Sequence, residues 1–242
     1  MKRAAILLCA AAAAILAGCS FLPVVRGSGY TVTTSFAVGS FSHVMAMQNC
    51  KVSIVPDAVT SLTITSDDNL VSYLTVTRNG PDSILIGLKQ GYIYVGTTFS
   101  AEVHVPTLSA VDMSGASQAV VEPGFPAADT LAVTLSGAST ADLQQVTIGT
   151  LAIDLSGSST LSGTGRVGQV TAVLSGASTA HLLDLPALSA RADLSGASEC
   201  WLNVGAGTMD LSASGASTLY YRGSPQVRQV NLSGASKLVQ VP

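Results

Sequence analysis

Few residues in this chain have the type and spacing needed for catalysis or metal binding. The 242 residues include only three histidines, His43, His104 and His181, and no Gly-x-Ser-x-Gly motif. A nucleophilic serine needs a neighbouring base, so the many serines are not predicted to be catalytic. Zinc requires clustered histidines and cysteines, and glycine-rich calcium repeats carry aspartates that are missing here. No metal, cofactor or serine-hydrolase site is therefore expected.

Three aspartates, Asp112, Asp154 and Asp193, are separated by 42 and 39 residues. If they occupy one column on alternate layers of a stacked β-structure, neighbours lie ~9.6 Å apart, at the upper edge of the range used by inverting glycosidases. A polysaccharide-acting enzyme is therefore one interpretation. Alternation would also keep like charges off adjacent layers, where they repel. We favour this structural interpretation, because no arginine or lysine cluster accompanies the aspartates.

A second set, His181, Trp201 and Tyr220, is spaced by 20 and 19 residues and includes the single tryptophan of the chain. On consecutive layers these rings would stack in an outward column. Exposed rings in a row suit contact with carbohydrate or protein, because they offer large rigid area at low entropic cost. They form the candidate ligand-contact face. The alternative is an aromatic ladder that stabilises stacking or packs under a loop.

Both sets hold fixed positions relative to one short repeated phrase. Copies are 19 to 22 residues apart, and so constant a period predicts a solenoid, in which each repeat forms one coil stacked on the last. The phrase is Ser-Gly-Ala-Ser, with Ser-Gly-Ser-Ser at Ser156, and its seven copies begin at Ser114, Ser136, Ser156, Ser175, Ser195, Ser214 and Ser233.

Alignment of the copies shows alternation of apolar and mostly polar positions before each phrase. This period of two is typical of strands with one buried face. The small residues of the phrase suit a corner where neighbouring backbones approach closely. The inward position directly before the phrase is occupied by Met113, Leu135, Leu155, Leu174, Leu194, Ala213 and Leu232.

Residues 30–110 lack the phrase but contain apolar segments typical of strands. We interpret them as irregular early coils that continue into the seven regular coils of 111–242, because no linker separates the two parts. A short helix is predicted over 67–73, where the aspartates suit an N-cap. The predicted strands cover 30–38, 44–55, 61–65, 74–76, 84–88, 92–95 and 101–105.

Residues 1–18 are typical of a bacterial lipoprotein signal peptide. Lys2 and Arg3 precede an apolar run, 4–16, that is too short to span a bilayer. The run ends in Leu-Ala-Gly-Cys, which resembles a lipobox, so Cys19 is the predicted lipidation site and 19–29 the tether. An ordinary cleaved signal peptide with a chance cysteine is the alternative. Ser20 follows Cys19, which in a Gram-negative host resembles the default for transport to the outer membrane.

Export would place the remaining cysteines in an oxidising compartment. Cys9 leaves with the signal peptide, so Cys50 and Cys200 could pair. Cys200 aligns with small apolar core positions of the other coils, and two buried free thiols are the favoured interpretation.

Composition excludes one class of partner. Eleven basic and 14 acidic residues give a net charge of −3, so the chain has no basic field of the kind that binds a phosphate backbone. Nucleic acid is not an expected partner. An apolar content of 48% leaves ample material for one continuous core.

Several segments together resemble the putative auto-transporter adhesin, head GIN domain family, over about residues 26–242. The resemblance implies a right-handed β-helix in an exported, often lipid-anchored protein, whereas the adhesin label rests on analogy of fold. The family commonly has Ser-Gly-Ser-Gly followed by Asp, and this chain lacks that aspartate. The segments are Gly27-Ser28-Gly29, Phe41 with Val44, Val52-Ser53-Ile54, Asp68-Asn69-Leu70, the seven phrases and Tyr220-Tyr221-Arg222-Gly223.

The sequence thus predicts an all-β chain: a right-handed parallel β-helix (solenoid) with coils of about 20 residues, in one domain over 30–242. We expect a non-catalytic lipoprotein of the cell envelope that serves binding, adhesion or scaffolding. Its expected partners are a membrane, through the lipid on Cys19, and a glycan or envelope protein. We expect the outer membrane or periplasm in a Gram-negative host, and the outer face of the cell membrane otherwise.

Overall fold

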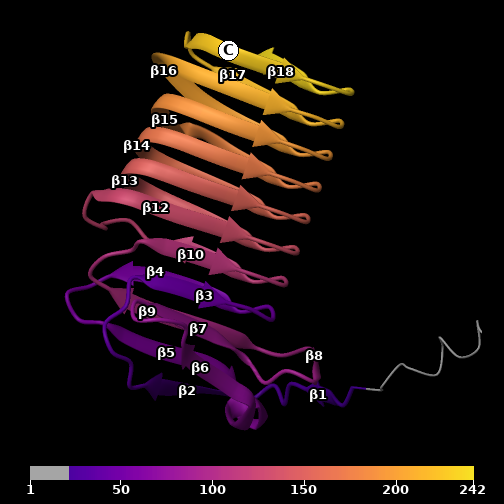
Figure 1. Cartoon of the computed structure of the whole chain (residues 1–242). Coiled ribbons are helices and arrows are strands. Elements are labelled where there is room, and N and C mark those ends of the chain that lie inside the picture. The colour runs from indigo at the N-terminus through magenta and orange to yellow at the C-terminus, as the bar shows by residue number, and fades with distance from the viewer. Residues whose placement is uncertain (1–21) are drawn as a thin grey trace, which may run out of the picture.

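The computed structural model describes residues 22–242 as a tall stack of β-strands (Figure 1). Seventeen strands form one continuous sheet, and β1 (Val24–Arg26) pairs with β8 (Ile93–Val95) in a separate sheet. From residue 110 to the last strand, pairing between successive coils is parallel. The predicted parallel β-helix with coils of about 20 residues is therefore confirmed.

Most regular coils are one long, bent strand that runs from the end of one phrase to the start of the next. The ladders are interrupted where these strands bend, for example between Leu143 and Val146. The first and last coils are split into shorter strands. The strands of the regular part are β10 (Ala110–Met113), β11 (Gln118–Val121), β12 (Ala128–Leu135), β13 (Thr140–Leu155), β14 (Thr160–Leu174), β15 (Thr179–Leu194), β16 (Glu199–Ala213), β17 (Thr218–Arg222), β18 (Gln226–Leu232) and β19 (Lys237–Gln240).

The inward side chains before the first six phrases lie in register and form the core. Leu232, before the last phrase, pairs with Ala213 but is 44% exposed, so the prediction of an inward position is wrong for this residue. Leu155 pairs with Leu174, and Leu174 with Leu194, in successive coils. All three are buried in a single apolar cluster that extends from Phe41 to Leu219. Burial of a leucine side chain contributes about 2 kcal/mol. Each inward leucine also packs against the coils above and below, so the core is continuous along the stack.

The Ser-Gly-Ala-Ser phrase forms one tight corner in every coil. Its glycine adopts a positive φ, +74° at Gly176, a region that glycine occupies without steric cost. The amide of the third residue donates to the glycine carbonyl of the preceding coil, as Ala177 does to Gly157 at 2.7 Å. A Cβ atom on Gly176 would lie 2.5 Å from that carbonyl oxygen. Glycine is therefore required both by the backbone angle and by the close approach of the coils.

The last serine of each of the first six phrases is buried although its side chain is polar. The hydroxyl of Ser178 donates to the backbone carbonyl of Ser175 at 2.9 Å, and equivalent bonds form in other phrases. A buried hydroxyl without a partner would cost about 1–3 kcal/mol. The bond within the phrase therefore makes this serine compatible with the core.

An eighth corner, with a different backbone conformation, precedes the seven phrases. β3 (His43–Ala46) and β4 (Lys51–Pro56) pair in parallel with β10 and β11. Between them, Gln48 and Asn49 adopt φ values of 63° and 64°. The register of β4 with β11 places Cys50 opposite Ser117, where the phrases have their buried serine. The amide of Cys50 donates to Ser117 Oγ at 3.2 Å. The predicted strand over 44–55 is thus divided by a corner that lacks the phrase.

The chain departs from the coil pattern at the indigo end of the stack in Figure 1. β7 (Ser83–Leu88) and β9 (Phe99–Val105) still pair in parallel with β3 and β4. β5 (Ser61–Asp67) and β6 (Leu74–Arg78) add antiparallel pairings, and β2 (Thr31–Phe36) closes the edge antiparallel to β5. This end of the molecule is therefore a mixed sheet.

The predicted short helix forms as the 3-10 helix η1 (Asp68–Tyr73), but Asp67 makes no side-chain cap bond. The expected N-cap role is wrong for this residue. Its buried carboxylate instead accepts the backbone amides of Gly29 at 2.8 Å and Thr98 at 2.6 Å. Asp67 therefore joins the N-terminal segment to the loop before β9.

Substitution of a corner glycine should weaken the whole stack. Gly176→Ala is expected to lower the free energy of unfolding by about 3 kcal/mol, because the new Cβ meets the carbonyl below and the backbone angle is strained. Ala177→Ser is the matched control, since Ser158 occupies that position in another coil. Urea unfolding followed by circular dichroism measures both. Equal unfolding midpoints for the two variants would contradict the corner geometry.

Candidate functional site

The strands that follow the phrases present one outward surface, which we call the ladder face. It comprises the outward side chains of 118–121, 140–143, 160–163, 179–182, 199–202 and 218–221. On this face His181 pairs with Trp201, and Trp201 with Tyr220, on consecutive coils. The three residues predicted as a ligand-contact column are thus brought together by β15, β16 and β17.

Two rings of this column stack on one another, and the third lies farther away and tilted. The centroids of Trp201 and Tyr220 are 3.8 Å apart with planes inclined by 13°, and His181 lies 6.3 Å from Trp201 with an inclination of 33°. Such pairs contribute about 0.5–1.5 kcal/mol beyond the area they bury. Tyr220 covers one side of the indole, whereas the tilted ring of His181 stands farther from the other side. The column therefore packs the coils together as well as exposing side chains.

A shallow pocket of about 350 Å³ opens beside the stacked rings. His181 and Trp201 line it together with Leu183 and Asp184. His181 and Asp184 are exposed, and neither makes an ion pair with any residue of 22–242. The indole Nε1 of Trp201 is buried without a hydrogen-bond partner in the same part of the chain. The pocket thus combines a carboxylate acceptor, an imidazole and an aromatic edge.

Sequence reasoning missed Leu183 and Asp184. Both lie where β15 bends, and the register between β15 and β16 shifts between Leu182 and Ala187. Coils differ in length at this bend, so the aligned repeats have no common column that would have singled out Asp184. The position of the aromatic column beside a bend is the one signal that could have directed attention to it.

The three predicted aspartates lie in another outward column, on residues that precede the phrases. Asp112 pairs with Thr134, which pairs with Asp154, and Val173 separates Asp154 from Asp193. The aspartates therefore occupy alternate coils, as the spacing predicts. An uncharged residue between each pair keeps the carboxylates off adjacent layers.

Two of these aspartates have charged or titratable partners. Asp112 Oδ2 shares a hydrogen bond of 2.8 Å with His43 Nε2 on the neighbouring coil. Asp193 Oδ2 lies 3.4 Å from Arg191 Nε. The column therefore contributes cross-coil and local contacts, and the ladder face does not include it.

The remaining histidine lies at the N-terminal end of the stack. His104 Nε2 is 2.7 Å from Glu102 Oε1, and His104 Nδ1 is 3.2 Å from Asp57 Oδ2. The hydrogen bond with Glu102 raises the pKa of His104 above its usual value, although desolvation opposes the shift. With both nitrogens facing carboxylates, this side chain ties β9 to the loop after β4.

Cys50 and Cys200 are buried free thiols, which confirms the favoured interpretation over a disulfide between them. Burial raises the pKa of each thiol to about 12, so both remain protonated and weakly nucleophilic at neutral pH. Cys200 pairs with Ala180 and Leu219 of the adjacent coils. Both cysteines are therefore core residues.

Cys19 and the signal peptide lie outside the residues that the structure describes. Within 22–242, no helix is long and apolar enough to cross a membrane. The same residues contain no group of three or more His, Cys, Asp or Glu side chains arranged to hold a metal ion.

Comparison with models of protein families gives one match. Residues 40–225 match the model described as putative auto-transporter adhesin, head GIN domain. A comparison with curated proteins finds no match.

Solved structures share the architecture. A putative adhesin from Bacteroides fragilis has a TM-score of 0.81 at 19% identity and covers 90% of this chain and 100% of its own. A putative lipid binding protein from Parabacteroides distasonis has a TM-score of 0.72 at 14% identity, with 90% and 100% covered. A putative adhesin from Parabacteroides merdae has a TM-score of 0.68 at 14% identity, with 91% and 100% covered. At these identities the similarity shows the fold alone.

Proposed function

The chain belongs to the putative auto-transporter adhesin, head GIN domain family, and we propose that it is a non-catalytic binding module of the cell envelope that contacts glycans through the pocket at the margin of the ladder face. One observation carries this proposal. His181, Trp201 and Asp184 converge on a single pocket at the edge of the aromatic stack.

The side chains of this pocket match the chemistry of a hydroxyl-rich ligand. Sugar hydroxyls donate hydrogen bonds to carboxylates, and their C–H surfaces pack against aromatic and aliphatic groups. Asp184 supplies the acceptor, whereas Leu183 and the edge of Trp201 supply the apolar contact. The exposed ring of His181 adds a second polar group beside them.

The backbone holds these groups in place before a ligand arrives. His181 and Trp201 sit on β15 and β16, which are hydrogen-bonded to each other along the coil. Trp201 is further fixed by its stacking on Tyr220. Preorganised side chains lose little conformational freedom on binding, which favours affinity.

A polysaccharide-acting enzyme that uses the column of Asp112, Asp154 and Asp193 is supported less well than a binding module. Neighbouring aspartates lie two coils apart, about 9.6 Å, and an inverting glycosidase needs one protonated and one ionised carboxylate at the same bond. Asp112 and Asp193 are already engaged by His43 and Arg191. We therefore favour binding without catalysis.

The proposed module is tethered to a membrane by a lipid on Cys19. The sequence Leu-Ala-Gly-Cys at 16–19 supports this assignment. In a Gram-negative host the tether would place the module at the outer membrane or in the periplasm, and otherwise on the outer face of the cell membrane. Stable anchoring requires more than one acyl chain.

Glycan binding should depend on Asp184. On a glycan array, we expect the full chain to bind at least one hydroxyl-rich glycan, and Asp184→Ala to weaken that binding about tenfold or more, because a charge-assisted hydrogen bond is lost. Asp154→Ala is the matched control, since it removes an exposed carboxylate from the other column. Trp201 is left unchanged because its ring packs on Tyr220.

Two outcomes would contradict this assignment. The first is an array on which the wild-type chain binds nothing. The second is equal binding by the wild type and Asp184→Ala, with loss in Asp154→Ala, which would move the contact to the carboxylate column.

Lipid attachment should depend on Cys19. In a bacterial host fed a clickable palmitate analogue, the full-length chain is expected to incorporate the label and Cys19→Ser to incorporate none. Cys9→Ser is the matched control within the leader and should keep the label. Labelling of Cys19→Ser, or none in the wild type, would exclude the lipid anchor.

A further inference from the structure

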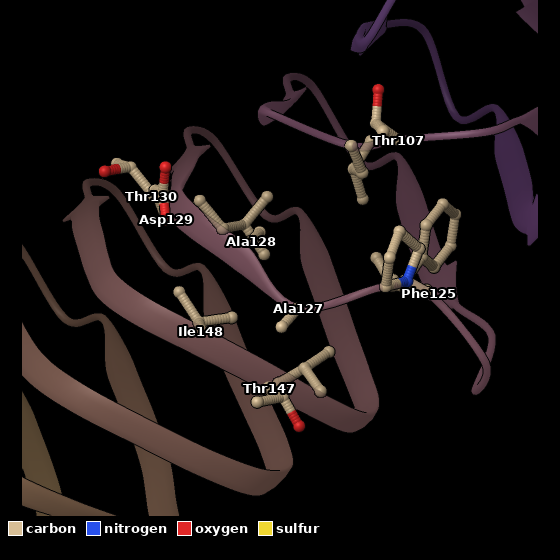
Figure 2. Close-up of a pocket in the computed structure, with 13 residues that line it drawn as sticks. Thr107, Phe125, Ala127, Ala128, Asp129, Thr130, Thr147 and Ile148 are labelled. Carbon is tan, nitrogen blue, oxygen red and sulfur yellow. The ribbon is translucent and has the colours of Figure 1, made fainter.

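A groove lies on the middle segment of the coils, apart from the ladder face. Its first part is a pocket of about 300 Å³ lined by Phe125, Leu108, Leu131 and Ile148 among others (Figure 2). Its second part is a hollow of about 440 Å³ over the following coils. Thr147 and Ile148 line both parts, so the two hollows adjoin along the coils, and we call them together the groove.

The groove exists because the first regular coil leaves the sheet between β11 and β12. Residues 122–127 form a loop with two prolines and a glycine, which cannot continue a paired strand. In β12, residues 128–131 consequently pair with β13 alone. On the side of residues 128–131 that faces β10, no strand is paired. Apolar side chains are therefore accessible there, whereas the equivalent side chains of later coils are covered.

Apolar groups continue along the second part of the groove. Leu188 is 74% exposed, and the register of the ladders places it between Gly168 and Gly207 of the adjacent coils. Because these two glycines carry no side chain, the space on either side of Leu188 stays open. Pro186 and Ala187 complete its apolar wall.

One cation borders this apolar surface. The exposed guanidinium of Arg166 lines the second part of the groove and makes no ion pair with residues 22–242. No acidic side chain lines that part, whereas Asp129 lies at the rim of the first. A single positive group beside an apolar groove is complementary to an amphiphile with an anionic head.

We propose that this groove binds a long-chain fatty acid, with the carboxylate at Arg166 and the acyl chain over Ile148 toward Phe125. An arginine donates two parallel hydrogen bonds to a carboxylate, which fixes the head group. The pocket beneath Phe125 has the volume of a small ligand site and reaches residues of the core. This site is independent of the glycan contact, because no residue lines both.

Displacement of a fluorescent fatty acid by palmitate tests the site. The full chain carrying Cys19→Ser is used, so that an attached lipid cannot compete. Thr147→Trp should block the shared part of the groove and weaken palmitate binding about tenfold or more. Thr134→Trp is the matched control, since it places the same bulk on an exposed threonine of another surface and should leave binding unchanged.

A comparison of palmitate with hexadecanol tests whether Arg166 binds the carboxylate. Arg166→Gln should weaken palmitate binding about tenfold and leave hexadecanol binding unchanged, because the alcohol has no charge to lose. This comparison also carries the test if Thr147→Trp does not fold. Lack of saturable displacement, equal affinities in the two tryptophan variants, or an equal effect of Arg166→Gln on acid and alcohol would overturn the proposal. Binding to phospholipid vesicles without binding of monomeric palmitate would also overturn it.

Discussion

The structure depends on one contact that is repeated at each corner from the second phrase onward: the amide of the third phrase residue donates to the glycine carbonyl one coil below. The distance is 2.7 Å from Ala138 to Gly115 and again from Ala216 to Gly196. So close an approach leaves no room for a Cβ atom and fixes the register of each coil on the last. Columns of equivalent residues follow from this register, in the core and on the surface.

The regular half of the fold could be predicted because its sequence repeats. Alternation before each phrase identified the buried leucines, and the alignment identified Cys200 as a core residue. The corner at 47–50 could not be found in this way, since its Gln48 and Asn49 adopt positive φ without a glycine. The antiparallel partners β2, β5 and β6 likewise carry no repeat, and their pairing depends on contacts distant in sequence.

The candidate sites also differ in whether they lie in the repeated part of the coils. The columns of aromatic rings and aspartates were predictable, because each member has a fixed offset from a phrase. Asp184 and the apolar groove were not, because they arise at bends and at the junction of the two halves, where coils differ. Stacking also changes what the aromatic column can offer: because Tyr220 covers one side of the Trp201 indole, less of the ring is free for contact and the neighbouring polar groups gain importance.

Amide hydrogen exchange measured by NMR tests the corner contact most directly. The third residues of the phrases have exposed side chains, so a simple turn would let their amides exchange freely with water. If each amide is bonded to the coil below, those of Ala138, Ser158, Ala177, Ala197 and Ala216 should exchange as slowly as the core strands, at rates set by global unfolding. Exchange of these five amides at the rate of unprotected loops would show that the coils are not joined at their corners.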